Sequence, residues 1–395
     1  MSAPAMRTGL DRIAAGDAAA IARVRGKTIG LVAHPASVDA RLVHAEQVLK
    51  DAGARIAVYF GPEHGYGGEA QDMIGVVGAR APDGAEIHSL YGATFDALTP
   101  RREQLEGLDA IVVDLQDVGS RYYTFVWTAA LVLRAASAAG IETIVLDRPN
   151  PLGGVRMEGA PQRAGYRSFV GLYDVPVRHA MTIGEIVTMV AALEGIDRAA
   201  LEIVAMEGWD SAATFERTGL PWVLPSPNMP TLETARVYPG GCLLEGTNAS
   251  EGRGATRPFE IVGAPWIDGR ALAGAVRAEG AVLRPLTFQP TFQKHAKAIC
   301  GGVQVHVIDD ARFAPYATYV RMVAAMRAIA GERFAWRTEE YEFVSDRPAI
   351  DLLTGGPEIR EAIDAGKGVE PLLAHGEREV ARFAEARREW LLYPR

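Results

Sequence analysis

The first 150 residues alternate between two hydrophobic periods. Short apolar runs rich in β-branched residues occupy 28–33, 55–60, 110–115 and 143–147, with a weaker run at 86–91. Unbroken apolar runs of this length are typical of strands covered on both faces, as in a parallel sheet. Helical patterns lie between them at 39–51 and 122–139. This alternation predicts right-handed βαβ units and an α/β fold, a Rossmann-like, doubly wound, mostly parallel sheet.

The pattern changes after Pro149, and the chain is too long for one compact core. A loop-rich passage, a helix and a further strand are expected at 149–180, 181–193 and 201–206, followed by a proline-punctuated stretch at 221–230. Beyond it we expect strands at 286–291 and 303–308 and helices at 312–329, 357–365 and 377–392. We therefore predict a Rossmann-like domain at 1–233 and a smaller C-terminal α/β domain at 234–395 that contributes to a cleft.

Polar and ionisable residues follow each of the predicted strands. The segments are His34-Pro35-Ala36-Ser37, Gly61-Pro62-Glu63-His64-Gly65, the run from Asp114 to Tyr123, and Asp147-Arg148-Pro149-Asn150. Ligands of open α/β sheets bind outside the carboxyl ends of the strands, which all meet at one edge. The convergence of these groups predicts a functional site there, although any single residue could equally be a turn or cap.

Several site chemistries lack their sequence signals. The first strand ends without the G-x-G-x-x-G of dinucleotide-binding proteins, and neither a P-loop nor a G-x-S-x-G motif occurs. The eight histidines are scattered without an H-E-x-x-H motif, so no metal ligand set is indicated. The formal net charge of −8 argues against nucleic acid as the partner.

Acid–base chemistry fits the loop after the second strand best. Glu63, among glycines at a strand end, is expected to be partly desolvated, which favours its protonated form and suits a general acid. Asp114, Asp117 and Asp147 are candidates for a second carboxylate, and nearby tyrosines could stack against sugar rings. Paired carboxylates with aromatic residues in a cleft are typical of glycoside hydrolysis, one of several hydrolase chemistries left open by these residues.

A second polar cluster lies close to the predicted domain junction. Residues 244–254 combine two acids with an arginine, an amide and hydroxyls, and Pro227-Asn228-Met229-Pro230 stands just upstream. Clefts commonly open between domains, which favours a binding role over an ordinary turn-rich surface loop.

These motifs together resemble one known family. They are Phe60-Gly61-Pro62-Glu63-His64-Gly65, the run from Asp114 to Thr124, the run from Asp147 to Gly154, Pro225-Ser226-Pro227-Asn228-Met229-Pro230 and the run from Glu245 to Gly254. Their content and order resemble the NamZ-type peptidoglycan exo-β-N-acetylmuramidases, long catalogued as a domain of unknown function. The likeness extends from about residue 9 to the C-terminus.

The resemblance implies a catalytic Rossmann-like domain, a smaller C-terminal domain and an active site in the cleft between them. It implies release of terminal N-acetylmuramic acid from the non-reducing end of peptidoglycan fragments, without metal or nucleotide cofactor. The glutamate of the Pro-Glu-His-Gly motif, here Glu63, is the implied catalytic residue.

The predicted site follows from these arguments. The catalytic candidates are Glu63 as general acid, His64 beside it and Asp114. The substrate-binding candidates are Gln116, Asp117, Arg121, Tyr122, Asp147, Arg148, Asn150, Asn228, Asn248, Glu251 and Arg253. Arg121, Arg148 or Arg253 would bind the lactyl carboxylate of muramic acid. A metal-dependent hydrolase with the same loops, or a non-catalytic muropeptide- or sugar-binding protein, remains the alternative.

The N-terminal stretch affects the expected location. Charged residues from Asp11 to Arg25 leave no room for the apolar core of a signal peptide, and no run is long enough to span a membrane. The sequence as given therefore predicts a cytoplasmic protein, although a chain from which a leader had been removed would read the same. Unlike the secreted relatives that the resemblance implies, a protein without a leader would act in intracellular muropeptide recycling.

Overall fold

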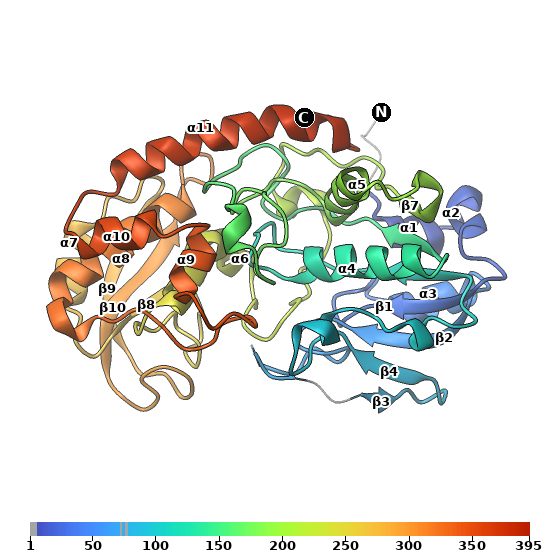
Figure 1. Cartoon of the computed structure of the whole chain (residues 1–395), viewed down its shortest axis with the longest axis horizontal. Helices are drawn as coiled ribbons and strands as arrows, with labels where there is room; N and C mark the ends of the chain where they lie inside the picture. The colour runs from blue at the N-terminus through green and yellow to red at the C-terminus, as the bar shows by residue number, and fades with distance from the viewer. Residues whose placement is uncertain (1–5, 72, 76–77) are drawn as a thin grey trace.

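The chain folds into two α/β domains that lie side by side (Figure 1). The computed structural model describes residues 6–71, 73–75 and 78–395. A seven-stranded sheet forms the centre of the N-terminal domain and a three-stranded sheet that of the C-terminal domain. Among the described residues, no helix is long and apolar enough to cross a bilayer.

The larger sheet has the strand order of a Rossmann fold. Its strands are β1 (Thr28–Val32), β2 (Arg55–Gly61), β3 (Ala79–Arg80), β4 (Glu86–Ser89), β5 (Ala110–Val113), β6 (Glu142–Leu146) and β7 (Leu201–Val204). They are arranged β3-β4-β2-β1-β5-β6-β7, and all pairs are parallel except β3 with β4. Counted over the parallel strands alone, the order is 3-2-1-4-5-6. The predicted doubly wound, mostly parallel fold is confirmed.

Alternate residues of the central strands pack into two separate cores. Ile111 and Val113 of β5 face one core, which includes α4 (Phe125–Ala138) and α5 (Ile183–Glu194). Ala110 and Val112 face the other, which includes α1 (Gly9–Ala14), α2 (Ala18–Ala22) and α3 (Ala45–Asp51). Burial on both faces is the reason that these strands read as unbroken apolar runs.

The helices α3 and α4 begin later than their sequence patterns predict. The helix expected at 39–51 starts only at Ala45, because Asp39 accepts the backbone N–H groups of Arg41 and Val43 in a turn. His44 then caps α3 through its ring nitrogen, which accepts the N–H of Glu46 at 3.2 Å. Local side-chain hydrogen bonds therefore replace the first helical turn.

The C-terminal domain packs helices around an antiparallel sheet. Its strands are β8 (Ile261–Ala264), β9 (Ala281–Phe288) and β10 (Cys300–Val307), in the order β8-β10-β9. Its helices are α6 (Leu232–Gly241), α7 (Gly269–Ala275), α8 (Pro315–Ala330), α9 (Ala349–Thr354), α10 (Glu358–Asp364) and α11 (Glu370–Ala386). The strand expected at 286–291 lies earlier, as does the helix expected at 377–392, whereas α8 and α10 match their predicted positions closely. The domain boundary at 233/234 stays a prediction.

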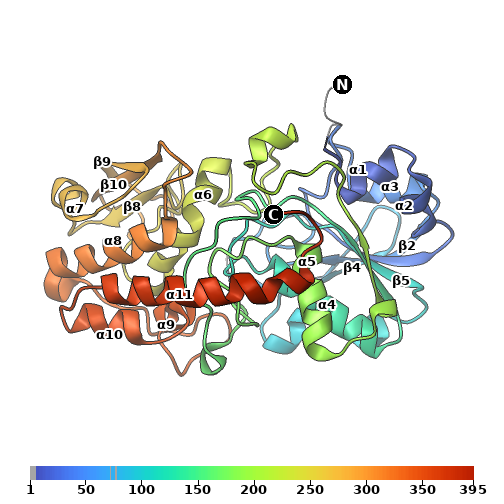
Figure 2. The same cartoon turned by 90° about the horizontal axis from the view of Figure 1, so that it is seen from above.

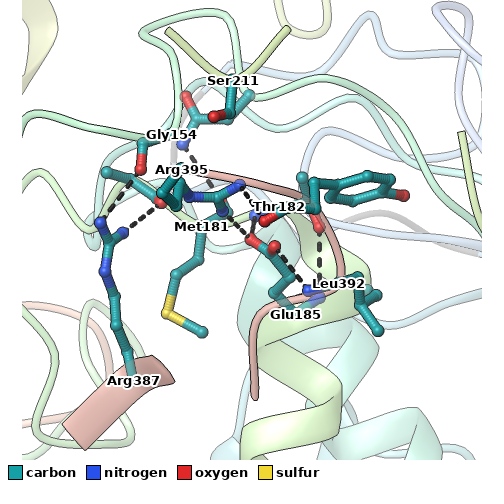
Figure 3. A network of polar contacts seen from close by, with 12 residues as sticks. Gly154, Met181, Thr182, Glu185, Ser211, Arg387, Leu392 and Arg395 are labelled. Atoms are coloured by element: carbon teal, nitrogen blue, oxygen red, sulfur yellow. Dashed lines mark hydrogen bonds and ion pairs between the residues drawn. The ribbon is translucent and has the colours of Figure 1, made fainter. Parts of the chain in front are cut away.

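The chain returns to the N-terminal domain at its C-terminal end. Both views show α11 running from the C-terminal domain across to the N-terminal domain (Figures 1 and 2). We call residues 387–395 the C-terminal strap. Arg387 donates to the carbonyls of Ala180 and Gly154, at 2.5 and 3.0 Å, and Arg395 pairs with Glu185 of α5 (Figure 3). The strap therefore packs on the domain in which the chain began.

Candidate active site

Glu63 lies buried in the loop that follows β2. At Gly61 an added Cβ would lie 2.2 Å from the backbone nitrogen of Tyr66, so only glycine permits the loop to fold back this tightly. The Glu63 side chain is 8% exposed, and its Oε2 accepts a hydrogen bond of 2.7 Å from Thr124 Oγ1. Thr124 is the N-cap residue of α4, so the loops that follow β2 and β5 meet at this carboxylate.

His64 is held in a strained backbone conformation beside Glu63. Its φ of 72° lies in the left-handed region, which costs a non-glycine residue about 1–3 kcal/mol. Its Nδ1 lies 2.8 Å from the carbonyl oxygen of Ala70, an arrangement that orients the ring. Such outliers cluster at functional sites, where the surrounding structure holds them in place.

Glu63 and His64 line a small cavity between the two domains. The residues around it are Glu63, His64, Tyr122, Tyr123, Thr124, Phe125, Val170, Ser226, Asn228, Met229, Tyr238, Glu245, Arg253, Phe259, Tyr341 and Glu342. The cavity measures about 30 Å³. This is room for one or two water molecules.

The C-terminal domain contributes a charged cluster to this cavity. Arg253 Nη1 lies 2.8 Å from Glu245 and 3.4 Å from Glu251, and its guanidinium lies 5.1 Å from the Phe259 ring centroid. Behind them, Lys294 pairs with Glu251 at 2.9 Å. Burial opposes the charged form of Glu251, yet the charges of Lys294 and Arg253 hold its pKa below the ordinary value. Glu251 therefore fixes Arg253 from behind, whereas Arg253 itself lines the cavity.

Tyr341 and Glu342, in the turn 341–344, also line the cavity, and neither is predicted from the sequence. Tyr341 Oη donates to Glu245 at 2.7 Å, and Tyr91 Oη donates to the two oxygens of Glu342 at 3.3 and 3.2 Å. Neither glycine nor proline marks this turn, and it follows no apolar strand. The sequence therefore carries no signal that would have indicated it.

Five of the predicted site residues line the cavity, and the others lie elsewhere. Those at the cavity are Glu63, His64, Tyr122, Asn228 and Arg253. Asn228 Nδ2 donates to Gln71 Oε1 at 2.7 Å, which joins the proline-rich segment to the loop after β2.

Asp114 and Arg148 form a buried ion pair with each other. Arg148 donates to both carboxylate oxygens, from Nε at 2.5 Å and from Nη2 at 2.8 Å, and Asp114 is fully buried. Gln116 donates to the carbonyls of Asp117 and Pro149 at 2.8 and 3.1 Å. These contacts join the segments that follow β5 and β6. The side chains of Asp114, Arg148 and Gln116 are therefore used in those contacts and do not line the cavity with Glu63.

Arg121 and Asp147 are likewise used within the fold. Arg121 donates to the carbonyls of Ala160, Val175 and Leu353 at 2.7–2.8 Å, and it is fully buried. Asp147 accepts hydrogen bonds from Thr182 Oγ1, the N–H of Gly184 and Tyr393 Oη. Both side chains therefore connect segments that are far apart in the sequence.

The remaining predicted residues stabilise loops. Asp117 accepts the N–H of Gly119 at 2.7 Å. Asn150 donates to the carbonyl of Met181 and accepts the N–H of Leu152. Asn248 donates to the carbonyl of Arg333 and accepts the N–H of Ala335.

A larger cavity of about 500 Å³ lies under α11, away from Glu63. Its walls include Met157, Tyr316, Leu372 and Leu373, together with Glu158, whose pKa burial raises to about 7. The smaller cavity is nevertheless the candidate site, because the loops that follow β2 and β5 meet there and polar groups of both domains converge on it. Among the described residues, no group of three or more His, Cys, Asp or Glu side chains is placed to hold a metal ion.

The structure combines a Rossmann-type sheet with a second α/β domain, and carboxylates from both line one cavity. This defines a class of two-domain α/β proteins with a polar site at the domain junction. Residues 29–233 match the family model "Exo-beta-N-acetylmuramidase NamZ, N-terminal", and residues 236–393 match the C-terminal model of the same name. The chain belongs to the exo-β-N-acetylmuramidase NamZ family.

Individual relatives agree with this assignment. The chain is 39% identical over 377 residues to the "Peptidoglycan beta-N-acetylmuramidase NamZ" of Bacillus subtilis (strain 168). The matched region covers 94% of this chain and 88% of the relative. The crystal structure of a DUF1343 family protein from Bacteroides fragilis NCTC 9343 has a TM-score of 0.86 at 28% identity and covers 99% of both chains. A second DUF1343 structure from this organism, 24% identical with a TM-score of 0.75, covers 98% of this chain and 99% of its own and shares the fold.

Proposed function

We propose that the protein is an exo-β-N-acetylmuramidase that releases terminal N-acetylmuramic acid from the non-reducing end of peptidoglycan fragments. Membership of the family carries the proposal, and the position of Glu63 supports it. Glu63 is a buried carboxyl group at a strand end, and it lines a cavity to which both domains contribute.

Glu63 acts as the general acid in this proposal. Thr124 Oγ1 fixes one carboxyl oxygen, which leaves the other to carry the proton that the leaving glycosidic oxygen takes. His64 orients this loop through its contact with the Ala70 carbonyl. Tyr122 and Tyr123, which line the same cavity, supply apolar ring surface for a sugar.

Arg253 is the arginine best placed to recognise the lactyl carboxylate of muramic acid. Of the three predicted arginines, only Arg253 lines the cavity, whereas Arg121 and Arg148 use their guanidinium groups within the fold. A forked guanidinium suits a planar carboxylate. Arg253→Lys should therefore lower kcat/KM for a muramide more than for the glucosaminide that lacks the lactyl group.

Hydrolysis of a chromogenic N-acetylmuramide tests the function directly. The wild type should cleave it, and Glu63→Gln should lower kcat by at least about 100-fold, because the amide cannot protonate the leaving group. Glu69→Gln is the matched control, since Glu69 is an exposed acid in the same loop. Wild-type turnover by Glu63→Gln would contradict the assigned acid.

Two further measurements separate the alternatives. A metal-dependent hydrolase would lose its activity after chelation and regain it with added metal, whereas the proposed enzyme should keep its activity. A non-catalytic binding protein would hold muropeptides without turnover, with equal affinity in the wild type and Glu63→Gln.

The cytoplasmic location and the recycling role stay predictions, which cell fractionation would check.

A further inference from the structure

The cavity holds two carboxylates besides Glu63, and both come from the C-terminal domain. They are Glu245 and Glu342. Glycoside hydrolysis generally uses a second carboxylate in addition to the general acid.

Glu245 is fully engaged in holding the charged cluster together. Its Oε1 lies 2.8 Å from Arg253 Nη1, and its Oε2 accepts a hydrogen bond of 2.7 Å from Tyr341 Oη. A carboxylate bound to an arginine on one oxygen and to a phenol on the other is fixed in position. This environment suits the positioning of Arg253 rather than proton transfer.

Glu342 occupies a backbone position that is unfavourable for a glutamate. Tyr341 and Val344 exchange backbone hydrogen bonds of 2.9 and 3.0 Å around a two-residue turn. Both central residues have positive φ, 46° at Glu342 and 66° at Phe343. Such turns usually contain Asn-Gly or Asp-Gly, because larger residues are strained in the left-handed region. A turn serving only to reverse the chain would have no need of a glutamate here.

Phe343 accounts for the position of the turn. Its ring packs against three aromatic rings of the N-terminal domain, with centroid distances of 5.7 Å to Tyr91, 6.4 Å to Phe169 and 6.2 Å to Phe95. Tyr91 also donates its hydroxyl to Glu342. The turn thus inserts from the C-terminal domain into the N-terminal domain and brings Glu342, 4% exposed, to the cavity that Glu63 lines.

We propose that Glu342 is the second catalytic carboxylate, delivered to the cavity by the strained turn 341–344. This inference rests on the proposed function. The bond between the anomeric carbon and the glycosidic oxygen breaks, and that oxygen takes the proton of Glu63. A water oxygen bonds to the anomeric carbon, and the carboxylate of Glu342 takes the proton that this water loses. Exchange with solvent then returns Glu63 to its protonated form and Glu342 to its ionised form.

Three variants of the full chain test this assignment with the chromogenic muramide. Glu342→Gln should lower kcat by about 10²–10⁴-fold, the range expected when a general base is lost. Glu340→Gln, a neighbouring exposed acid two residues earlier, should keep wild-type activity. Glu342→Ala should recover turnover in sodium azide, because the small anion attacks the anomeric carbon directly and gives a glycosyl azide that mass spectrometry detects.

A stability measurement guards against a loss of activity caused by misfolding. Glu342→Asn places a residue that tolerates positive φ at the strained position, so its Tm should equal or exceed that of the wild type while its activity is lost. Near wild-type kcat in Glu342→Gln, or an inactive Glu342→Ala that azide does not rescue, would overturn the proposal. Failure of the wild type to cleave the muramide would instead refute the proposed function.

Discussion

At the scale of single residues, the sequence predicts where polar groups gather better than it predicts what each one contacts. Asp114 and Glu63 both follow a buried strand, and both read as candidates for the site. Only Glu63 lines the cavity, because Asp114 is paired with Arg148, which follows the neighbouring strand β6. Pairing between strand ends depends on register and on side-chain direction, and neither is encoded in the spacing of residues along the chain.

Asp147 provides a residue-scale prediction about pH. Burial raises its pKa to about 6 from the ordinary 3.8, although Tyr393, Gly184 and Thr182 donate hydrogen bonds to it. Between these values the folded protein holds a proton that the unfolded chain has lost, so stability falls as pH rises from about 4 to about 6. The loss amounts to about 3 kcal/mol of unfolding free energy.

Asp147→Asn removes this titration. The difference in unfolding free energy between the variant and the wild type should shift by about 3 kcal/mol in favour of the variant as pH rises from 4 to 7. Urea denaturation at each pH would measure it. Asp210→Asn, at an exposed site, is the control. Parallel stability curves for the wild type and Asp147→Asn would contradict the prediction.

At the scale of elements, strands were easier to predict than helices that contain breaking residues. The central strands β1, β2, β5 and β6 lie within a residue or two of their predicted positions, because burial on both faces produces a clear pattern. The helix α6 was not predicted, since its sequence contains Pro239, Gly240 and Gly241. Packing against α8 decides its structure, and such tertiary contacts override local propensity.

Gly240 is expected to be essential for that packing. A Cβ at this position would lie 2.2 Å from the carbonyl oxygen of Pro315 and 2.5 Å from the Tyr319 ring. Gly240→Ala should therefore lower the free energy of unfolding by about 1–3 kcal/mol. Gly274→Ala in α7 is the matched control, because nothing lies within 4 Å of the added methyl group.

The control should keep or slightly raise stability, by up to about 1 kcal/mol, since alanine favours helix over glycine. Thermal and urea unfolding of the two variants would check the contrast. Equal stabilities of Gly240→Ala and Gly274→Ala would contradict the prediction that the packing of α6 on α8 requires glycine at position 240.

At the scale of the whole molecule, contacts between distant segments build both the fold and the site. Glu342 meets Tyr91, and Arg387 meets Gly154, across more than two hundred residues of sequence. A pattern analysis of local windows cannot find such pairs. The doubly wound sheet was predictable because its signal is local, whereas the contribution of the C-terminal domain to the cavity was only partly predictable.

Arg387 offers a test of the C-terminal strap. It is 5% exposed and donates to the carbonyls of His179, Ala180 and Gly154. Arg387→Ala leaves these oxygens without this donor and should cost about 2–3 kcal/mol of unfolding free energy. Arg388→Ala, at the next and exposed position, should change stability by less than about 0.5 kcal/mol. Urea unfolding would measure both, and equal effects would contradict a special role for Arg387.

The strap makes the C-terminal domain an insertion with two covalent crossings. The chain leaves the N-terminal domain just before α6 and returns to it after α11, where Arg387 and Arg395 anchor it (Figures 2 and 3). A domain tethered at one point can swing in any direction, whereas one tethered at two points rotates chiefly about the line that joins them. The strap therefore leaves the C-terminal domain fewer directions of movement than a single linker would, because both ends of the inserted segment are held on the same domain.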